Sequence, residues 1–194
     1  KTMIFWKLIL PVFLPLLLIS NTLQAASALA ELIKAGNRDG AMEMIRAGAD
    51  VNMPQDDGTT PLHWAVYQVD QELVASLLRN EANPNISNNF GATPLSEAVR
   101  VANADLVAML LNAGANPDQA NDDNQTPLML AAWTGVVDVA ALLIQHGAQV
   151  NTEENWTGQS ALMWAGSRNH PAMAELLITN GADVKIRARS FDWS

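Results

Sequence analysis

The side chains of this sequence that could support chemistry are three histidines and three pairs of adjacent acids. They are His63, His146 and His170, and Asp56 with Asp57, Asp122 with Asp123, and Glu153 with Glu154. Paired carboxylates could act as calcium ligands or as a general acid and base, because hard cations prefer several carboxylate oxygens. The Asp-x-Asp-x-Asp-Gly loop of calcium sites does not occur. We therefore interpret the acidic pairs as solvated loop residues.

The histidines have structural interpretations as well. His146 precedes a glycine that ends a helix, where the helix dipole favours a cation, and His170 precedes Pro171 at the start of another helix. The sequence contains no G-x-S-x-G, H-E-x-x-H, phosphate-binding glycine loop or dinucleotide-binding pattern. We therefore expect no catalysis, no cofactor and no metal site.

Composition excludes several further classes of function. The 194 residues include 11 Lys and Arg against 20 Asp and Glu, a formal net charge of −9. Binding to nucleic acid needs clustered cations that displace counterions, so nucleic acid is not an expected partner. The absence of cysteine excludes disulfides, thiolate zinc sites and cysteine nucleophiles. The fold must be held together by packing.

Residues 1–26 have the order of a secretory signal peptide. Lys1 and Lys7 precede twelve apolar residues, 8–19, and small residues follow at 25–28, so cleavage is expected after Ala25, Ala26 or Ala28. Twelve helical residues rise about 18 Å, less than the roughly 30 Å hydrocarbon core of a bilayer. The protein is therefore expected to be exported, either periplasmic or secreted. The alternative is an uncleaved segment that tethers the protein to a membrane.

A pattern of about 33 residues repeats along the rest of the chain. One marker, a Thr-Pro-Leu-like start, occurs at intervals of 33, 33 and 34 residues from Thr60, at Thr93, Thr126 and Ser160. A second marker occurs at intervals of 33, 33, 33 and 34 residues, beginning at Ala49, Ala82, Ala115, Ala148 and Ala182. Both markers assign one extra residue to the stretch between Val150 and Ser160. Two markers with one period indicate an array of equivalent units.

Each unit is predicted to form a helix, a turn, a second helix and an extended loop. Thr followed by Pro is a strong helix start, because the hydroxyl accepts a backbone N–H and proline suits the first turn. The second helix has apolar pairs four residues apart: Leu73, Val74, Leu77 and Leu78; Leu106, Val107, Leu110 and Leu111; Val139, Ala140, Leu143 and Ile144. Glycine follows most second helices, where a left-handed residue is expected. Glu81 takes this place once and should be strained by roughly 1 kcal/mol.

The period and the Thr60–Ala65 segment, T-P-L-H-W-A, resemble the ankyrin-repeat family. The resemblance implies an all-α solenoid of about five helix-turn-helix repeats with β-hairpin-like loops. The expected ankyrin-repeat domain spans 27–189, with repeats at about 27–57, 58–90, 91–123, 124–157 and 158–189. The first repeat resembles an N-terminal cap. In the family, the motif histidine bonds between repeats, and only His63 stands at that position here.

Glycosylation sequons begin at Asn85, Asn124 and Asn155 and would matter only in a eukaryotic secretory pathway. The resemblance instead assigns a backbone hydrogen-bonding role to Asn85 and Asn151. Residues 190–194 are expected to begin a further, truncated repeat. One alternative follows from this expectation, in which the array is the regulatory or targeting arm of a longer enzyme whose catalytic domain lies beyond Ser194.

Ankyrin arrays bind partners through loop tips and the exposed side of the first helix, which implies a non-catalytic protein-protein interaction module. By position, the expected protein-binding residues are Asp56, Asp57, Tyr67, Gln68, Asn89, Phe90, Arg100, Asp122, Asp123, Trp133, Trp156 and Arg168. Aromatic residues rimmed by carboxylates predict a partner protein with an apolar groove and a basic border. The alternative for Phe90 and Trp156 is packing beneath their own loops. We expect the protein to be a monomer.

Overall fold

The computed structural model describes residues 28–189, so the predicted signal peptide (1–26) and the predicted start of a further repeat (190–194) lie outside the described residues. Ten α-helices and no named strand occur in this part of the chain. The helices are α2 (Ala28–Lys34), α3 (Arg38–Arg46), α4 (Pro61–Tyr67), α5 (Gln71–Arg79), α6 (Pro94–Arg100), α7 (Ala104–Asn112), α8 (Pro127–Thr134), α9 (Val137–Gln145), α10 (Ala161–Ser167) and α11 (Pro171–Thr179). The predicted all-α class is confirmed.

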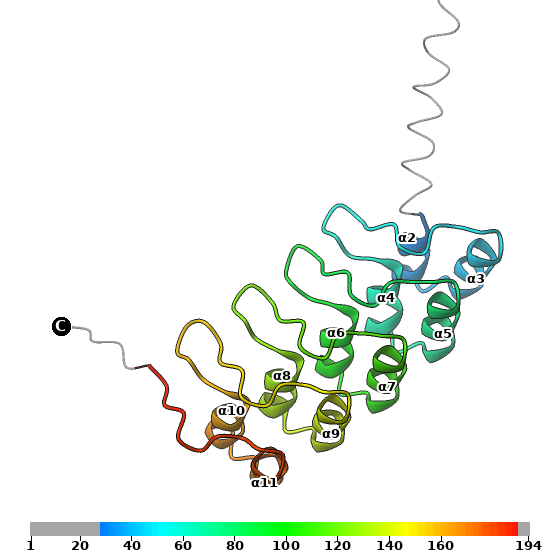
Figure 1. Cartoon of the computed structure of the whole chain (residues 1–194). Coiled ribbons are helices and arrows are strands. Elements are labelled where there is room, and N and C mark those ends of the chain that lie inside the picture. Colours follow the sequence, from blue (N-terminus) through cyan, green and yellow to red (C-terminus); the bar gives the residue numbers. More distant parts are fainter. Residues whose placement is uncertain (1–27, 190–194) are drawn as a thin grey trace, which may run out of the picture.

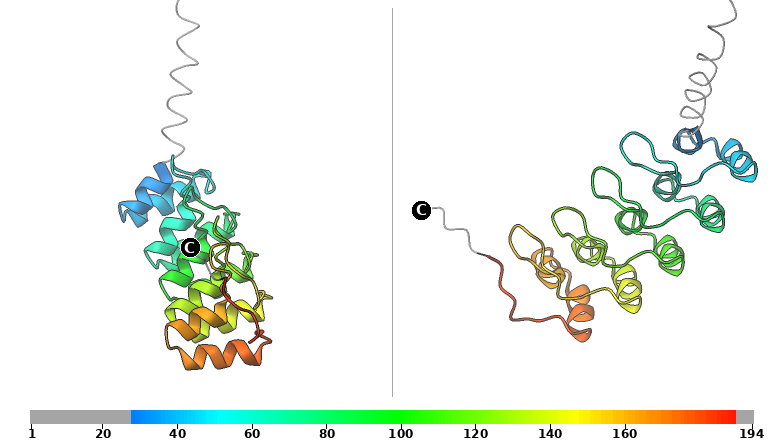
Figure 2. Two further views of the ribbon diagram at one scale, coloured as in Figure 1. Left: turned by 90° about the vertical axis from the view of Figure 1, so that its left-hand side faces the viewer. Right: turned by 45° about the horizontal axis from the view of Figure 1, so that its top comes forward.

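The helices form two layers (Figure 1). The first helix of each pair packs on the first helix of the next pair, in the order α2, α4, α6, α8 and α10. The second helices α3, α5, α7, α9 and α11 pack in the same way in the other layer. The loops that join successive pairs all project on the side of the first helices (Figure 2). The array is therefore a solenoid in which each unit contacts its neighbours.

Threonine and proline start the first helices as predicted. Thr93 and Thr126 each accept a hydrogen bond from the backbone N–H three residues later, at 3.1 and 3.3 Å. A proline occupies the first helical position of α4, α6 and α8. None of these helices has more than eight residues, so packing between repeats must supply most of their stability.

The predicted apolar stripes of the second helices form the core. Leu77, Leu110 and Leu143 occupy equivalent positions in α5, α7 and α9, and all three are fully buried. They belong to one hydrophobic cluster that extends from Leu29 in α2 to Leu177 in α11. A continuous core of this kind is what allows helices of seven to nine residues to be stable.

Equivalent backbone hydrogen bonds close the loops, and their spacing locates the extra residue. The N–H donates to the carbonyl oxygen four residues later in three loops, from Gln55 to Thr59, Asn88 to Ala92 and Asn121 to Gln125. In the fourth loop, Glu154 donates to Gln159, five residues later, at 3.0 Å. The predicted insertion between Val150 and Ser160 is therefore confirmed and lies within 155–158.

Five residues other than glycine have left-handed backbones in turns where other repeats have glycine, namely Val69, Glu81, Ala102, Asn124 and Asn169. Glu81 follows α5 with φ of 65°, as the sequence predicted, and Gly114 has φ of 87° at the equivalent position. Val69 lies between α4 and α5 with φ of 57°, where an equivalent turn has Gly135 at φ of 76°. A β-branched residue is rare in this conformation, so Val69 is strained, and its residue type gave no sign of this.

Asparagine side chains connect successive repeats at the ends of the second helices. The Nδ2 of Asn85 donates to the carbonyl oxygen of Gly114 at 3.0 Å, and its Oδ1 accepts from the N–H of Asn116 at 2.8 Å. Asn52 and Asn151 make the equivalent pair of bonds. The backbone role predicted for Asn85 and Asn151 is confirmed. Asp118 stands at the third of these four equivalent positions and only accepts a hydrogen bond, from the N–H of Gln149 at 2.7 Å.

Replacing Asp118 with Asn should stabilise the protein. By equivalence with Asn85, the new amide would donate to the carbonyl oxygen of Gly147, which a carboxylate cannot do. One added hydrogen bond is worth about 1 kcal/mol in the free energy of unfolding. Urea unfolding should show a higher midpoint with an unchanged slope. Asp122→Asn removes the same charge from an exposed loop and is the control. Equal midpoints for the two variants would show that only charge matters.

Candidate protein-interaction surface

Four aromatic side chains are exposed on one face of the solenoid. We call this the loop face, and define it as the loop tips together with the first helices α4, α6, α8 and α10. Tyr67, Phe90, Trp133 and Trp156 expose 55%, 77%, 43% and 65% of their surfaces. The alternative that Phe90 and Trp156 pack beneath their own loops is therefore wrong. The structure leaves all four predicted aromatic residues accessible.

The loop tips are of two kinds, which alternate along the solenoid. One kind has two adjacent acids, and the other has an asparagine followed by an aromatic residue. In order along the solenoid, the tips are Asp56 with Asp57, Asn89 with Phe90, Asp122 with Asp123, and Asn155 with Trp156. The N–H of Asn89 donates to the carbonyl oxygen of Asp57 at 2.8 Å, and the N–H of Asn155 donates to that of Asp123 at 2.9 Å. Each acidic tip is thus joined to an aromatic tip, and the arrangement occurs twice, two repeats apart.

A hollow of about 340 Å³ lies between the first of these tip pairs and the helices α4 and α6. Its walls include Asp57 and Phe90 from the tips, Trp64 and Tyr67 from α4, and Glu97 and Arg100 from α6. A second hollow of about 120 Å³ shares Phe90, Glu97 and Arg100 with the first and continues toward Asn121 in the third loop. Four of the predicted residues therefore meet around one depression, namely Asp57, Tyr67, Phe90 and Arg100.

Aromatic rings on this face already contact cations of the protein itself. The guanidinium of Arg168 lies 3.7 Å from the ring centroid of Trp133, and that of Arg100 lies 6.0 Å from that of Tyr67. The ammonium of Lys34 lies 5.2 Å from the centroid of Trp64. Cations are attracted to the negative face of an aromatic ring. The geometry thus shows that a cationic side chain can lie against an aromatic ring on this face.

A hydrogen bond stabilises the charged form of Asp57 at the first acidic tip. The carboxylate of Asp57 accepts the N–H of Thr59 at 2.9 Å, and this bond, stronger than the opposing effect of partial burial, lowers the pKa of Asp57. The ion pairs found within residues 28–189 join Arg38 to Asp70 and Glu72, and Arg100 to Glu97. The carboxylates of the tips take part in none of these, so their charge is available to a ligand.

Two of the predicted binding residues support the fold directly. The Nε2 of Gln68 donates to the carbonyl oxygen of Ile33 at 2.6 Å, which caps the end of α2. Asn89 joins two loop tips, since its Nδ2 also reaches the carbonyl oxygen of Asp56 at 3.3 Å. Trp156 is exposed, yet its Nε1 donates to Asp123 at 2.7 Å, which fixes the orientation of the ring.

The interpretation of the acidic pairs as solvated loop residues is wrong for Glu154. Its side chain is buried and accepts hydrogen bonds from the backbone N–H groups of Trp156, Thr157 and Gln159 at 2.6, 2.8 and 2.9 Å, and from the Thr157 hydroxyl. Burial alone would raise the pKa of Glu154, but these bonds outweigh it and the pKa is lowered. Asn88 and Asn121 hold the equivalent loops. The 33-residue register could have revealed this role.

The three histidines make structural hydrogen bonds. His63 is buried, and its Nε2 lies 3.0 Å from the carbonyl oxygen of Ala92 in the next repeat. His146 follows α9 and bonds to the carbonyl oxygen of Leu142 in that helix, and His170 lies 3.2 Å from the carbonyl oxygen of Trp133. Within residues 28–189, no group of three or more His, Asp or Glu residues is placed to hold a metal ion.

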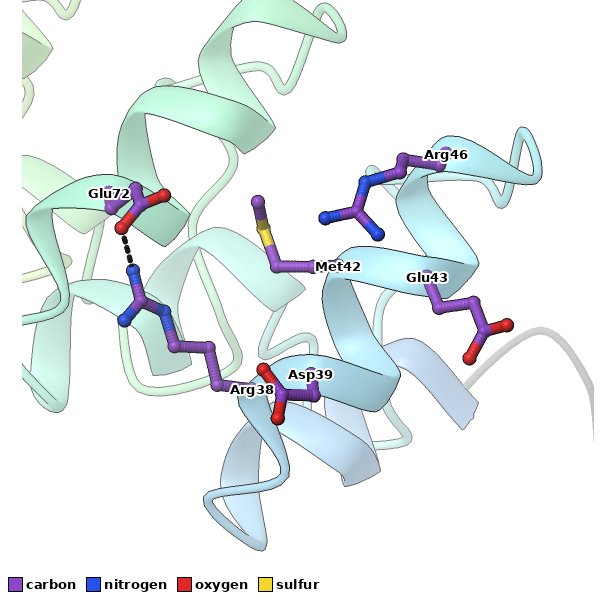
Figure 3. A pocket seen from close by; sticks show the side chains of 6 residues that line it. All are labelled: Arg38, Asp39, Met42, Glu43, Arg46 and Glu72. Carbon is purple, nitrogen blue, oxygen red and sulfur yellow. Dashed lines mark hydrogen bonds and ion pairs between the residues drawn. The ribbon is translucent and has the colours of Figure 1, made fainter.

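A separate depression, which the sequence did not predict, lies among the second helices, away from the two hollows of the loop face. Figure 3 shows that residues of α3 line this space of about 510 Å³ together with Glu72 of α5. Arg38 is paired with Glu72 and, at 3.1 Å, with Asp70. The lining mixes both signs of charge and contains no nucleophile beside a base. It therefore offers no catalytic arrangement.

The family comparison agrees with this architecture. The family model described as ankyrin repeats (3 copies) matches residues 25–121 and again 95–188. No curated protein matches the chain in sequence. No helix in the described part of the chain is long and apolar enough to cross a membrane. Ankyrin repeats are generally protein-protein interaction modules and are typically not catalytic. With two overlapping matches that extend over most of its length, this chain belongs to the ankyrin-repeat family.

Proposed function

We propose that this chain is an exported, non-catalytic adaptor that binds another protein through its loop face. The observation that carries the proposal is the row of four exposed aromatic residues, of which Tyr67 and Phe90 line the larger hollow and Phe90 also lines the smaller one. Apolar surface gathered on one face and rimmed by polar residues is a common mark of a protein interaction site. Tyr and Trp also dominate binding energies at interfaces, because they bury a large area and keep one polar atom.

The test removes two aromatic residues of the loop face. Tyr67→Ala combined with Trp133→Ala should lower the affinity for the partner by about 100-fold, since each anchor contributes roughly 1–2 kcal/mol, and a pull-down should recover much less of it. Circular dichroism should show unchanged helix content. The control is Ile178→Ala with Val184→Ala, which removes exposed apolar surface from the last repeat. The proposal fails if the aromatic variant and the control recover equal amounts of partner.

Export is proposed from the order of charged, apolar and small residues in 1–26. Mass spectrometry of the protein recovered from its native host should find a mature N-terminus near Ala26. The protein should fractionate with periplasmic or secreted proteins. A retained 1–26 segment in a membrane fraction would instead support the tethered form of the adaptor.

A further inference from the structure

We propose that the loop face binds an extended segment of the partner that carries two basic side chains about six residues apart. Each side chain would lie against one acidic tip and the aromatic tip joined to it. This inference rests on the proposed function and specifies the chemistry of the partner. It starts from the repetition of one local arrangement, Asp57 beside Phe90 and Asp123 beside Trp156.

The hollow at the first tip pair suits a long side chain with an apolar stem and a charged end. Trp64, Tyr67 and Phe90 give it apolar walls, while Asp57 and Glu97 place carboxylates on it. An apolar side chain there would desolvate the charge of Asp57 without replacing its water, which is costly. Lys and Arg satisfy both requirements, since their methylene stems pack on rings while the cation reaches a carboxylate.

The charges of the face favour this occupant. Glu97 is engaged by Arg100, whose Nε lies 3.0 Å away, and Arg168 is stacked on Trp133. The carboxylates of Asp57 and Asp123 take part in none of the ion pairs within residues 28–189. Each is fixed by a hydrogen bond, from Thr59 N–H in one case and from the Trp156 indole in the other. Both subsites therefore present an ordered negative charge beside an exposed ring.

The separation of the subsites sets the spacing of the basic residues. The two tip pairs are two repeats apart, and packed helices lie about 8–10 Å from one another, so the subsites are roughly 16–20 Å apart. An extended strand advances about 3.3 Å per residue, so about six residues span this distance. An even number also places both side chains on the same side of the strand.

The experiment measures binding of two labelled peptides by fluorescence anisotropy. One has two arginines separated by five threonines, and the other has the same composition and length with the arginines only two positions apart. The first should bind about tenfold more tightly, because only it reaches both subsites. Binding should weaken as salt is raised, since exposed charges are screened.

Two protein variants distinguish binding at the two subsites from a general effect of the negative charge of the protein. Asp57→Asn with Asp123→Asn keeps the oxygen acceptors of Thr59 N–H and the Trp156 indole but removes both charges. It should weaken binding of the widely spaced peptide by about tenfold. Asp39→Asn with Glu43→Gln makes the same change of charge on α3, away from the loop face, and should leave the affinity unchanged.

Equal affinity for the two peptides, or equal weakening by the two variants, would overturn the inference. The proposed function is tested apart from it, because the aromatic variants report on the partner itself. If Tyr67→Ala with Trp133→Ala loses the partner while the two Asp→Asn changes do not, the adaptor function stands and a basic partner segment is excluded.

Discussion

Replacing Glu154 with Ala should lower the free energy of unfolding by about 3 kcal/mol. The buried carboxylate accepts three backbone N–H groups and one hydroxyl, and a hydrogen bond to a charged group contributes about 1.5–3 kcal/mol net. The loop around it is exposed, so water can replace part of this network and the total loss is smaller than the sum of four such bonds. Its removal leaves partly buried donors without a protein partner. Urea unfolding followed by circular dichroism measures the change, and the fourth and fifth repeats should unfold first.

Two further variants and the pH dependence make this prediction specific. Glu153→Ala removes the exposed neighbour and should change stability by no more than about 0.5 kcal/mol. Glu154→Gln keeps one acceptor oxygen and should give an intermediate loss. Because the pKa of Glu154 is lowered on folding, its contribution is complete above the unfolded value of about 4.3 and is lost as the pH falls through the folded value. A constant difference between wild type and Glu154→Ala from pH 6 to pH 3 would contradict this role.

The repeated pattern was sufficient to predict the helices and their packing. Thr93 and Thr126 marked helix starts, and leucines such as Leu110 marked the buried side of the second helices. These features depend on local hydrogen bonds and on helical periodicity, and both are written in neighbouring residues. The strain at Glu81 was likewise predictable, because the equivalent residue elsewhere is glycine.

Other features depend on contacts between repeats, and residue type alone did not predict them. Glu154 has the composition of a solvated loop acid, but its longer side chain spans a loop with one extra residue, where Asn88 and Asn121 serve the shorter loops. Gln68 is exposed, yet it caps a helix of the preceding repeat. The first hollow likewise combines residues from two loops and two helices. Glu154, Asn88 and Asn121 occupy the same position in their repeats, and comparing them would have predicted the role of Glu154.

Hydrogen bonding between repeats also explains why replacing His63 should have a large effect on the stability of the protein. The Nδ1 of His63 lies 3.2 Å from the N–H of Thr60, and its Nε2 lies 3.0 Å from the carbonyl oxygen of Ala92. These partners fit a neutral ring that accepts at Nδ1 and donates at Nε2. Burial lowers the pKa of His63, more than the carbonyl of Ala92 raises it.

His63→Ala should therefore destabilise the protein by about 3 kcal/mol at pH 7.5, through a cavity and the lost hydrogen bonds to Thr60 and Ala92. His63→Ser should recover about 1 kcal/mol, since Ser96 bonds to the N–H of Thr93 at the equivalent position but reaches no other repeat. As the pH falls below about 6.5, the unfolded chain takes up a proton that folded His63 resists, so wild type loses stability that neither variant loses. Urea unfolding at pH 7.5 and 5.5 measures both effects. A gap between wild type and His63→Ser that does not narrow at the lower pH would show that the ring is not held neutral by its burial between repeats.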